Sequence, residues 1–344
     1  MSNVTGLSNK EWIKQTLHHK EFDYVPYNFI FMPVSVQQAM NHYGENLEEA
    51  LDLPLRFYGP ETKKPLYADP DLFGPTITDE FGVTWTTNRI DRGAPTGPSL
   101  NEPTLEGFTF PDPEEETRFQ WIENWCEYQK DHYRVMMVGD LWERATFMRG
   151  MENLLLDTIL NPKFVETLLY ELTDYIIKGM LKLFEMDCEF EAIFLMDDYG
   201  TQRSTIISPD QWRKFVKPCL EKIYSLAREN GSDIIHHTCG HVTPLIGDMI
   251  DIGLDILNPI QPETMNIKEL KNEFGKDVTF WGGLSTQDLL INGTPQQVID
   301  QVRWLKDVMG KDGGYIFDTG LSIQADVPQE NLFAMIDEAL KPRN

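Results

Sequence analysis

The sequence predicts an α/β protein that folds as a single (β/α)8 barrel of the TIM type. Three observations indicate this fold. Short apolar runs of strand length alternate with helical segments, and eight such runs can be counted. No glycine-rich phosphate loop, which an open doubly wound sheet would carry, follows an early run. The length of 344 residues is also compatible with one barrel domain.

Each predicted strand is short, apolar and not alternating, as is typical of parallel strands that are covered on both faces. The runs are residues 25–32, 81–85, 135–138, 192–196, 233–235, 254–257, 278–281 and 315–317. Residues 43–130 are irregular and rich in Pro, Gly and Asp. We expect them to form an extension or cap over the barrel mouth, within one domain of residues 1–344.

The helices between these runs are marked by capping residues. Ser8 and Glu11 have the spacing of a capping box, which predicts a helix that carries Trp12 and Ile13. Several other starts combine a capping residue with a proline in the first turn, at Asn161, Ser208, Thr294 and Asp326. Alternating strands and helices of this kind imply right-handed βαβ units.

The formal net charge of −25 makes nucleic acid and anionic membrane surfaces poor partners, because both would repel the chain. No apolar run is long enough to span a bilayer, and no secretory signal is visible. The four cysteines have no zinc-ribbon spacing, and a chain of this length needs no disulfide. We therefore expect a cytoplasmic protein with reduced cysteines. The oligomeric state is open, with a homodimer as one alternative.

Polar side chains gather after the carboxyl ends of the predicted strands, where barrel enzymes place their active sites. The segments are residues 139–144, 197–200, 236–240, 258–261, 282–285 and 318–320. From them we select Trp142, Glu143 and Gln261 as candidate substrate- or cofactor-binding residues. Asn28, in the first predicted strand, joins this set.

The segment His236-His237-Thr238-Cys239 is the sharpest local pattern. Imidazole and thiolate are ligands that zinc favours, and a His-x-Cys pair at a strand end could present both to one ion. A helix that begins near Thr243 would further favour the thiolate of Cys239. The alternative is a hydrogen-bonded histidine beside a buried small residue.

Asp197 and Asp198 form a carboxylate pair at another strand end. Adjacent residues point in opposite directions, so only one of the two can face the barrel axis. Asp198 and Tyr199 are candidate catalytic residues, Asp198 as an acid, a base or a metal ligand and Tyr199 in contact with substrate. The alternative roles are a helix cap or an ion pair with Arg203.

Several longer motifs resemble the uroporphyrinogen decarboxylase superfamily. They are residues 233–261, residues 278–288, residues 149–155, and residues 313–316 together with residues 326–331. The resemblance covers most of residues 130–340 and supports the barrel. True decarboxylases of this superfamily hold their acidic substrate with an Arg-Gln-Ala-Gly-Arg segment after the first strand, whereas residues 27–32 contain no arginine.

The chain resembles more closely the cobalamin-dependent branch, which includes methylcobalamin:coenzyme M methyltransferases. There the zinc ligands are a His-x-Cys pair, matched by His237 and Cys239, and a second Cys after the last strand. Leu321 occupies that last position. Asp318, three residues earlier, is the ligand that we expect instead, with His236 and Asp198 in reserve. One thiolate fewer hardens the ion and favours an oxygen or nitrogen atom on the substrate.

The resemblance implies a zinc-dependent methyltransferase that moves a methyl group between a small molecule and a corrinoid protein. No corrinoid-binding Asp-x-His-x-x-Gly motif occurs, so cobalamin would come from a separate subunit. Two other functions remain open. One is a metal-free decarboxylase of a small aromatic or pyrrolic acid, and the other is a barrel that binds corrinoid without chemistry.

Overall fold

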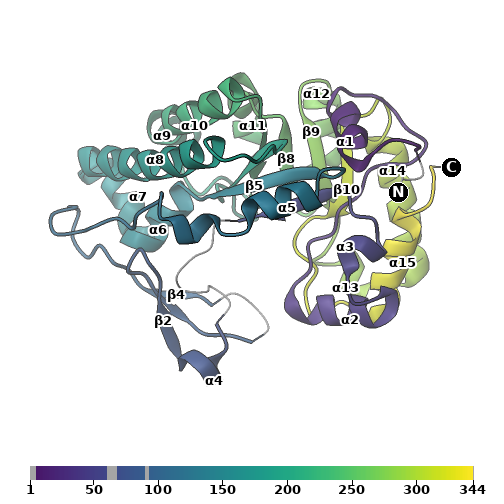
Figure 1. Ribbon diagram of the computed structural model, residues 1–344, viewed down its shortest axis with the longest axis horizontal. Helices are drawn as coiled ribbons and strands as arrows, with labels where there is room; N and C mark the ends of the chain where they lie inside the picture. The colour runs from purple at the N-terminus through teal and green to yellow at the C-terminus, as the bar shows by residue number, and fades with distance from the viewer. Residues whose placement is uncertain (1–4, 60–67, 90–92, 344) are drawn as a thin grey trace.

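Seven parallel strands form a curled sheet at the centre of the computed structural model, which describes residues 5–59, 68–89 and 93–343 (Figure 1). The strand order is β1-β5-β6-β7-β8-β9-β10, so each strand from β5 onward lies beside the next one in the chain. Their bounds are β1 Leu55–Tyr58, β5 Tyr133–Gly139, β6 Ala192–Met196, β7 Asp233–His237, β8 Ile256–Ile260, β9 Thr279–Leu284 and β10 Tyr315–Thr319.

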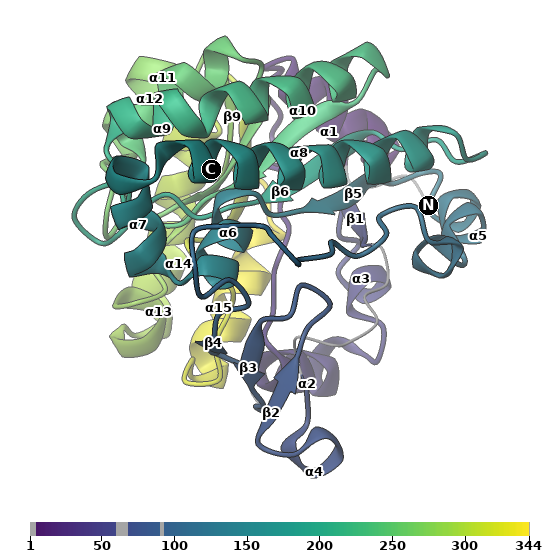
Figure 2. The same ribbon diagram turned by 90° about the vertical axis from the view of Figure 1, so that its left-hand side faces the viewer.

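Helices cover the outside of this sheet. The main ones are α8 Pro162–Phe184, α9 Pro209–Phe215, α10 Lys217–Glu229, α11 Thr243–Asp251, α12 Ile267–Phe274, α14 Pro295–Met309 and α15 Gln329–Ala339. A further helix, α1 Asn9–Leu17, contributes Ile13 to the apolar cluster inside the sheet. α8 packs on β5, α10 on β7, and α14 on β9 and β10. Figure 2 shows α8 crossing in front of β5 and β6. The alternation of parallel strands and covering helices predicted from the sequence is therefore present after residue 130.

Further helices lie near the strand ends and in the connections. They are α2 Pro33–Tyr43, α3 Leu47–Ala50, α4 Pro70–Phe73, α5 Ile122–Tyr128, α6 Trp142–Arg149, α7 Met151–Leu160 and α13 Leu289–Asn292, with a 3₁₀ turn at Glu116–Phe119. The capping box of Ser8 and Glu11 is confirmed, and a second one joins Thr294 to Gln297. These caps satisfy amide groups that the first helical turn leaves without partners.

The predicted first strand lies beside β10 but contributes only isolated bridges. Tyr27 pairs with Phe317 and Phe31 pairs with Ile323, both in parallel. Among the described residues, no backbone hydrogen bond joins this segment to β1, whose strand partner is β5. The α/β class and the parallel sheet are as predicted, whereas the eight-stranded closed barrel is not reproduced.

One of the eight predicted strands was placed wrongly. The run at residues 81–85 contributes to β3 Thr84–Thr86, which pairs antiparallel with β2 Thr76–Thr78 and β4 Pro95–Gly97 in a separate small sheet. This sheet and α4 project away from the main sheet in both views (Figures 1 and 2). The strand that the sequence did not reveal is β1, because its four residues lie between Pro54 and Gly59 in a segment that reads as loop.

The side chains inside the curled sheet form a compact apolar layer. Leu55, Val135, Phe194, Ile235, Ile256, Trp281 and Ile316 belong to one buried cluster, each from a different strand. Neighbouring residues along the strands, such as Ile234, Leu257 and Phe317, belong to the cluster that packs beneath the helices. This alternation determines which residues at the strand ends point inward.

A buried ion pair joins the amino ends of β5 and β6. Glu191 accepts hydrogen bonds from the backbone nitrogen, Nε and Nη2 of Arg134, at 2.9, 3.1 and 3.0 Å. Lys10 lies 2.6 Å from the same carboxylate. Burial alone would raise the pKa of Glu191, but the hydrogen bonds from Arg134 and Lys10 lower it below its ordinary value.

Cys126 and Cys188 are joined by a disulfide, contrary to the expectation that every cysteine is reduced. The first lies in α5 and the second between α8 and β6, and the pairing of β5 with β6 brings the two segments together. Within the described residues, no helix combines the length and the apolar character that crossing a bilayer requires.

We predict that Glu191→Gln lowers the free energy of unfolding by about 3–5 kcal/mol near neutral pH, because it removes the only buried counter-charge that the structure describes beside the Arg134 guanidinium. Folding lowers the pKa of Glu191 from 4.5, so its stabilisation is present above that pH and is lost as the pH falls through the folded-state value. Urea unfolding at several pH values should therefore show the difference from wild type narrowing below pH 4.5.

The matched control is Glu189→Gln. Its carboxylate lies 3.8 Å from Arg134 but is 90% exposed, so its removal should leave the unfolding free energy nearly unchanged. Equal destabilisation by both variants would show that the buried pair has no special role.

Candidate functional site

Three potential metal ligands meet at the carboxyl ends of β6 and β7. Cys239 Sγ lies 3.3 Å from His237 Nε2, and His237 Nε2 lies 3.7 Å from Asp198 Oδ1. The ligand atoms of all three side chains lie within 4.8 Å of one another. Among the described residues, this is the only group of three or more His, Cys, Asp or Glu side chains with such spacing.

The imidazole of His237 is held in one orientation. Its Nδ1 donates to Asn258 Oδ1 at 2.7 Å, and a carboxamide oxygen can only accept. In the neutral ring Nε2 then carries the lone pair, and it faces the thiol and the carboxylate. Asn258 comes from β8, the strand that pairs with β7, and its register partner is His237. Asn258 was not among the candidates chosen from the sequence, although it lies in the predicted strand-end segment 258–261.

Two glycines allow the loops after β6 and β7 to touch. A Cβ on Gly200 would lie 2.4 Å from the carbonyl oxygen of Cys239, and a Cβ on Gly240 would lie 2.5 Å from the carbonyl carbon of Gly200. Gly240 also has a φ of +84°, which other residues rarely adopt. The backbone nitrogen of Cys239 donates to Asp198 Oδ1 at 2.7 Å across this contact. Glycine at both positions therefore brings the carboxylate of Asp198 beside the His-x-Cys pair.

The adjacent carboxylates Asp197 and Asp198 have different surroundings. Asp197 is fully buried and accepts hydrogen bonds from the backbone nitrogens of Trp142 and Glu143, at 2.9 and 2.6 Å, and from the hydroxyl of Tyr199. It thus caps the first turn of α6. Burial raises the pKa of Asp197 to about 7, against the lowering effect of these hydrogen bonds.

Asp318, the expected third ligand, does not join the group. Its Oδ2 accepts from Trp281 Nε1 at 3.0 Å, and its Oδ1 accepts from the backbone nitrogen and the hydroxyl of Thr319 at 2.7 and 3.2 Å. Burial raises its pKa well above the ordinary value despite these hydrogen bonds. The structure therefore brings Asp198, one of the two reserve candidates, to His237 and Cys239.

His236, the other reserve candidate, points outward toward α10. Its Nδ1 is 2.7 Å from the hydroxyl of Tyr224, and its ring stacks on Tyr199 at 5.3 Å. Burial lowers the pKa of His236 to about 3, so the ring is neutral. The alternation of side chains along β7 separates the two histidines, because His237 faces the inside of the sheet.

The other candidate residues lie around this group in supporting positions. Tyr199 and Trp142 are completely buried, and their contact with substrate stays a prediction. The backbone nitrogen of Glu143 donates a hydrogen bond to Asp197 and so links this residue to the site. Gln261 Oε1 accepts from the backbone nitrogen of Gly240 and so supports the loop that carries Cys239.

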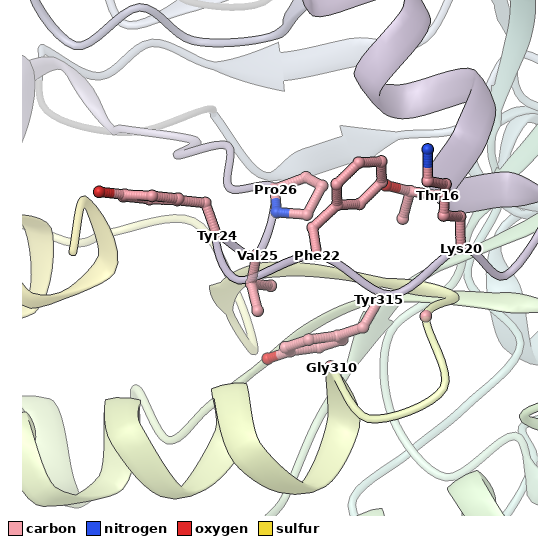
Figure 3. A pocket seen from close by; sticks show the side chains of 9 residues that line it. Thr16, Lys20, Phe22, Tyr24, Val25, Pro26, Gly310 and Tyr315 are labelled. Carbon is pink, nitrogen blue, oxygen red and sulfur yellow. The ribbon is translucent and has the colours of Figure 1, made fainter. Parts of the chain in front are cut away.

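Hollows of different size lie near the sheet. A small one of about 10 Å³ is lined by Lys20, Phe22, Pro26 and Tyr315 (Figure 3). Tyr315 is the first residue of β10, so this hollow lies at the amino ends of the strands, away from the metal-ligand group. A larger cavity of about 410 Å³ includes Asn28 and Phe57 in its lining.

A family model described as "Uroporphyrinogen decarboxylase (URO-D)" matches residues 80–341. The chain belongs to the uroporphyrinogen decarboxylase family. This membership confirms the resemblance that residues 149–155, 233–261 and 278–288 carry. The same stretch contains Asp198, His237, Cys239 and Asn258, so the metal-ligand group lies within the part of the chain that defines the family.

Relatives of this family member include methyltransferases. It is 27% identical over 263 residues to a methylated-thiol–coenzyme M methyltransferase of Methanosarcina mazei, covering 74% of this chain and 67% of that protein. It is 26% identical over 131 residues to a methylcobamide:CoM methyltransferase of Methanosarcina barkeri, covering 38% and 36%. Uroporphyrinogen decarboxylases are also among its relatives.

The fold also matches a solved structure. A methyltransferase from Methanosarcina mazei superposes with a TM-score of 0.71 at 19% identity, covering 97% of this chain and 98% of the other. At this identity the match supports the fold, and the relatives by sequence support methyl transfer as the class of reaction.

We predict that Asp197→Ala lowers the free energy of unfolding by about 3 kcal/mol or more, because three buried donors lose their shared acceptor. Asp198→Ala, next in the chain, should cost about 1 kcal/mol, because it loses one backbone hydrogen bond at a partly exposed position. Urea unfolding of the two variants in metal-free buffer measures the difference. Equal losses would contradict the separation of the pair into a structural and a ligand-presenting carboxylate.

Proposed function

We propose that the chain is a zinc-dependent methyltransferase that moves a methyl group between a small molecule and a corrinoid carried by a separate protein. The observation that carries the proposal is the meeting of Asp198, His237 and Cys239 at the carboxyl ends of β6 and β7. The methyltransferases among the relatives supply the class of reaction.

The donor set fits zinc. One imidazole nitrogen, one thiolate and one carboxylate are ligands that zinc accepts, and three protein ligands are typical of catalytic sites, where the fourth position is left to substrate. Two anionic donors would balance the charge of a divalent ion. His237 is already oriented through Nδ1 by Asn258, which is the arrangement that ligating histidines commonly have.

We assign the third ligand to Asp198 in place of Asp318. Bound zinc would act as a Lewis acid toward the heteroatom that carries or receives the methyl group. The chain's own residues prepare this site. Asn258 fixes the imidazole, the Gly200–Gly240 contact fixes the thiol relative to the carboxylate, and Asp197 anchors the segment that carries Asp198.

The corrinoid is proposed to come from a partner protein, and the cytoplasm remains the proposed compartment. The second candidate reaction is the decarboxylation for which the family is named. Residues 27–32, at the place where the decarboxylases have their basic segment, contain no arginine to hold a polycarboxylate, which favours methyl transfer. The non-catalytic alternative would bind corrinoid and transfer no methyl group.

We predict one zinc ion per chain after reconstitution, measured by elemental analysis of the desalted protein. His237→Ala, Cys239→Ala and Asp198→Ala should each lose the ion, whereas Asp318→Asn should keep it. Asn258→Leu should weaken zinc binding by about 10- to 100-fold, because it removes the group that orients His237. Circular dichroism of each variant verifies the fold.

The pair Asp198→Ala and Asp318→Asn decides the third ligand. Retention of zinc by the first variant and its loss by the second would restore the assignment made from sequence. Stoichiometric zinc that no variant in this set removes would overturn the proposed site.

We predict that the zinc-loaded protein methylates reduced free cobalamin when supplied with a suitable methylated donor, observed as the change in the cobalamin spectrum. Cys239→Ala should lower the rate by about 10³-fold or more, since the Lewis acid contributes several kcal/mol. Carbon dioxide release from an aromatic acid by metal-free protein would instead support decarboxylation, and cobalamin binding without transfer to or from any compound would support the non-catalytic alternative.

A further inference from the structure

The two loops that carry the metal-ligand group are joined by a reciprocal pair of hydrogen bonds. Beyond the ends of β6 and β7, the backbone nitrogen of Tyr199 donates to Thr238 Oγ1 at 2.9 Å. In the opposite direction, the backbone nitrogen of Cys239 donates to Asp198 Oδ1 at 2.7 Å. Each loop therefore supplies one side-chain acceptor to an amide of the other loop.

These side-chain acceptors lie where the backbone pairing of β6 with β7 is interrupted. The last backbone bond before the interruption runs from the nitrogen of Asp197 to the carbonyl oxygen of His237, at 2.9 Å. The next one joins the nitrogen of His241 to the carbonyl oxygen of Thr201, at 2.8 Å, with none between them among the described residues. Because a buried amide without an acceptor is costly, the hydroxyl of Thr238 takes the place of a backbone carbonyl.

Thr238 is the middle residue of the His-x-Cys pair and is completely buried. The side chains of His237 and Cys239 meet, with 3.3 Å between Nε2 and Sγ, so the alternation along the chain turns Thr238 away from them. Its backbone nitrogen donates to the carbonyl oxygen of Asn258 at 2.7 Å, which extends the pairing of β7 with β8. Thr238 therefore links its loop to both neighbouring strands, on the side opposite to the ligands.

Asp198 lies between two residues that are themselves held in place. Asp197, which precedes it, is bonded through its backbone to His237 and through its carboxylate to α6. Tyr199, which follows it, donates through its amide to Thr238 and through its hydroxyl to Asp197. The bond to Thr238 is thus the one that ties the far side of Asp198 to the strand of the His-x-Cys pair.

The two reciprocal bonds differ in their relation to a bound ion. The acceptor for the amide of Cys239 is Asp198 Oδ1, which also lies 3.7 Å from His237 Nε2. An ion bound by this group would draw on the same carboxylate. The hydroxyl of Thr238 is buried and bonds only within the loops, so it does not have to serve a ligand role as well. It can hold the two loops together with and without metal.

We propose that Thr238 is a positioning residue of the metal-ligand group, and that its hydroxyl holds the loop after β6 against β7 and so keeps Asp198 beside His237 and Cys239. The consequence for zinc binding rests on the function proposed above. The position of Asp198 is a property of the metal-free chain. This role requires a hydroxyl at the middle position of the His-x-Cys pair, which a methyl group cannot replace.

The test compares Thr238→Val, which keeps the shape and loses the acceptor, with Thr238→Ser, which keeps the acceptor. Zinc affinity is measured by competition with a chromophoric chelator. The absorption spectra of the cobalt(II)-substituted proteins report the thiolate ligand and the coordination geometry. Thr238→Val should weaken zinc binding by about 10- to 100-fold, as removal of a group that orients metal ligands does, and should alter the cobalt spectrum. Thr238→Ser should match wild type in both.

A second measurement needs no metal. Of the free cysteines, Cys219 is buried and Cys239 is partly exposed, so alkylation of the native, metal-free protein reports on Cys239. Thr238→Val should raise the alkylation rate by about tenfold, because the loss of one hydrogen bond makes opening of the loop more frequent. Thr238→Ser should react at the rate of wild type.

Thr16→Val is the matched control for the loss of a buried threonine hydroxyl. Thr16 is 2% exposed, its hydroxyl donates to the carbonyl oxygen of Trp12 at 2.9 Å, and it lines the small hollow at the amino ends of the strands. Its substitution should lower stability and leave zinc affinity, the cobalt spectrum and the alkylation rate unchanged. If Thr238→Val does not fold, Thr238→Ala takes its place with the same expected results, because it also removes the acceptor.

Zinc affinity and a cobalt spectrum that stay at wild-type values in Thr238→Val would overturn the proposal, and so would a Thr238→Ser protein as impaired as Thr238→Val. If the wild-type chain bound no zinc, the proposed function would fail, and the alkylation rates would decide the role of Thr238 alone. An unchanged rate in Thr238→Val would then reject that role, whereas a raised rate that Thr238→Ser restores to the wild-type value would support it.

Discussion

The contact between the loops after β6 and β7 is the constraint on which the candidate site depends. The parallel register pairs Met196 with His237, so both strands end at the same level. The backbones of Gly200 and Gly240 then touch at a distance that excludes any Cβ, and Cys239 donates to Asp198 across the contact. The carboxylate of Asp198, the imidazole of His237 and the thiol of Cys239 are thereby brought together by the backbone positions of two neighbouring strands.

The same constraint explains why neighbouring residues have opposite roles. Asp197 and His236 point away from the sheet interior, where burial drives them to bond with α6 and with Tyr224 on α10. Asp198 and His237 come next in the chain and face the partly exposed interior. The outer pair fixes the strand ends against the helices, and the inner pair can therefore present its atoms to a ligand with little loss of conformational entropy on binding.

Local sequence patterns were sufficient to predict most of the helices and strands after residue 130. Capping residues and short apolar runs predicted the helices and strands after residue 130, because each signal acts over a few residues. β1 was missed because four residues between a proline and a glycine give no periodic pattern. His237 and Cys239 lie close in sequence and could be paired, whereas the choice of Asp198 over Asp318 depends on the hydrogen bond of Trp281 to Asp318 and on the glycine contact. Both contacts join residues that are far apart in the sequence, so no local pattern could predict them.

The donor set of the candidate site bears on the kind of group that the proposed enzyme would activate. A site with one thiolate and one carboxylate would make a bound zinc ion harder than a site with two thiolates would, which favours an oxygen or nitrogen atom as the group that is activated. The carboxylate of Asp198 reaches the His-x-Cys pair because the loops after β6 and β7 touch at Gly200 and Gly240. The same contact that assembles the three side chains would therefore also set the chemical character of an ion bound between them.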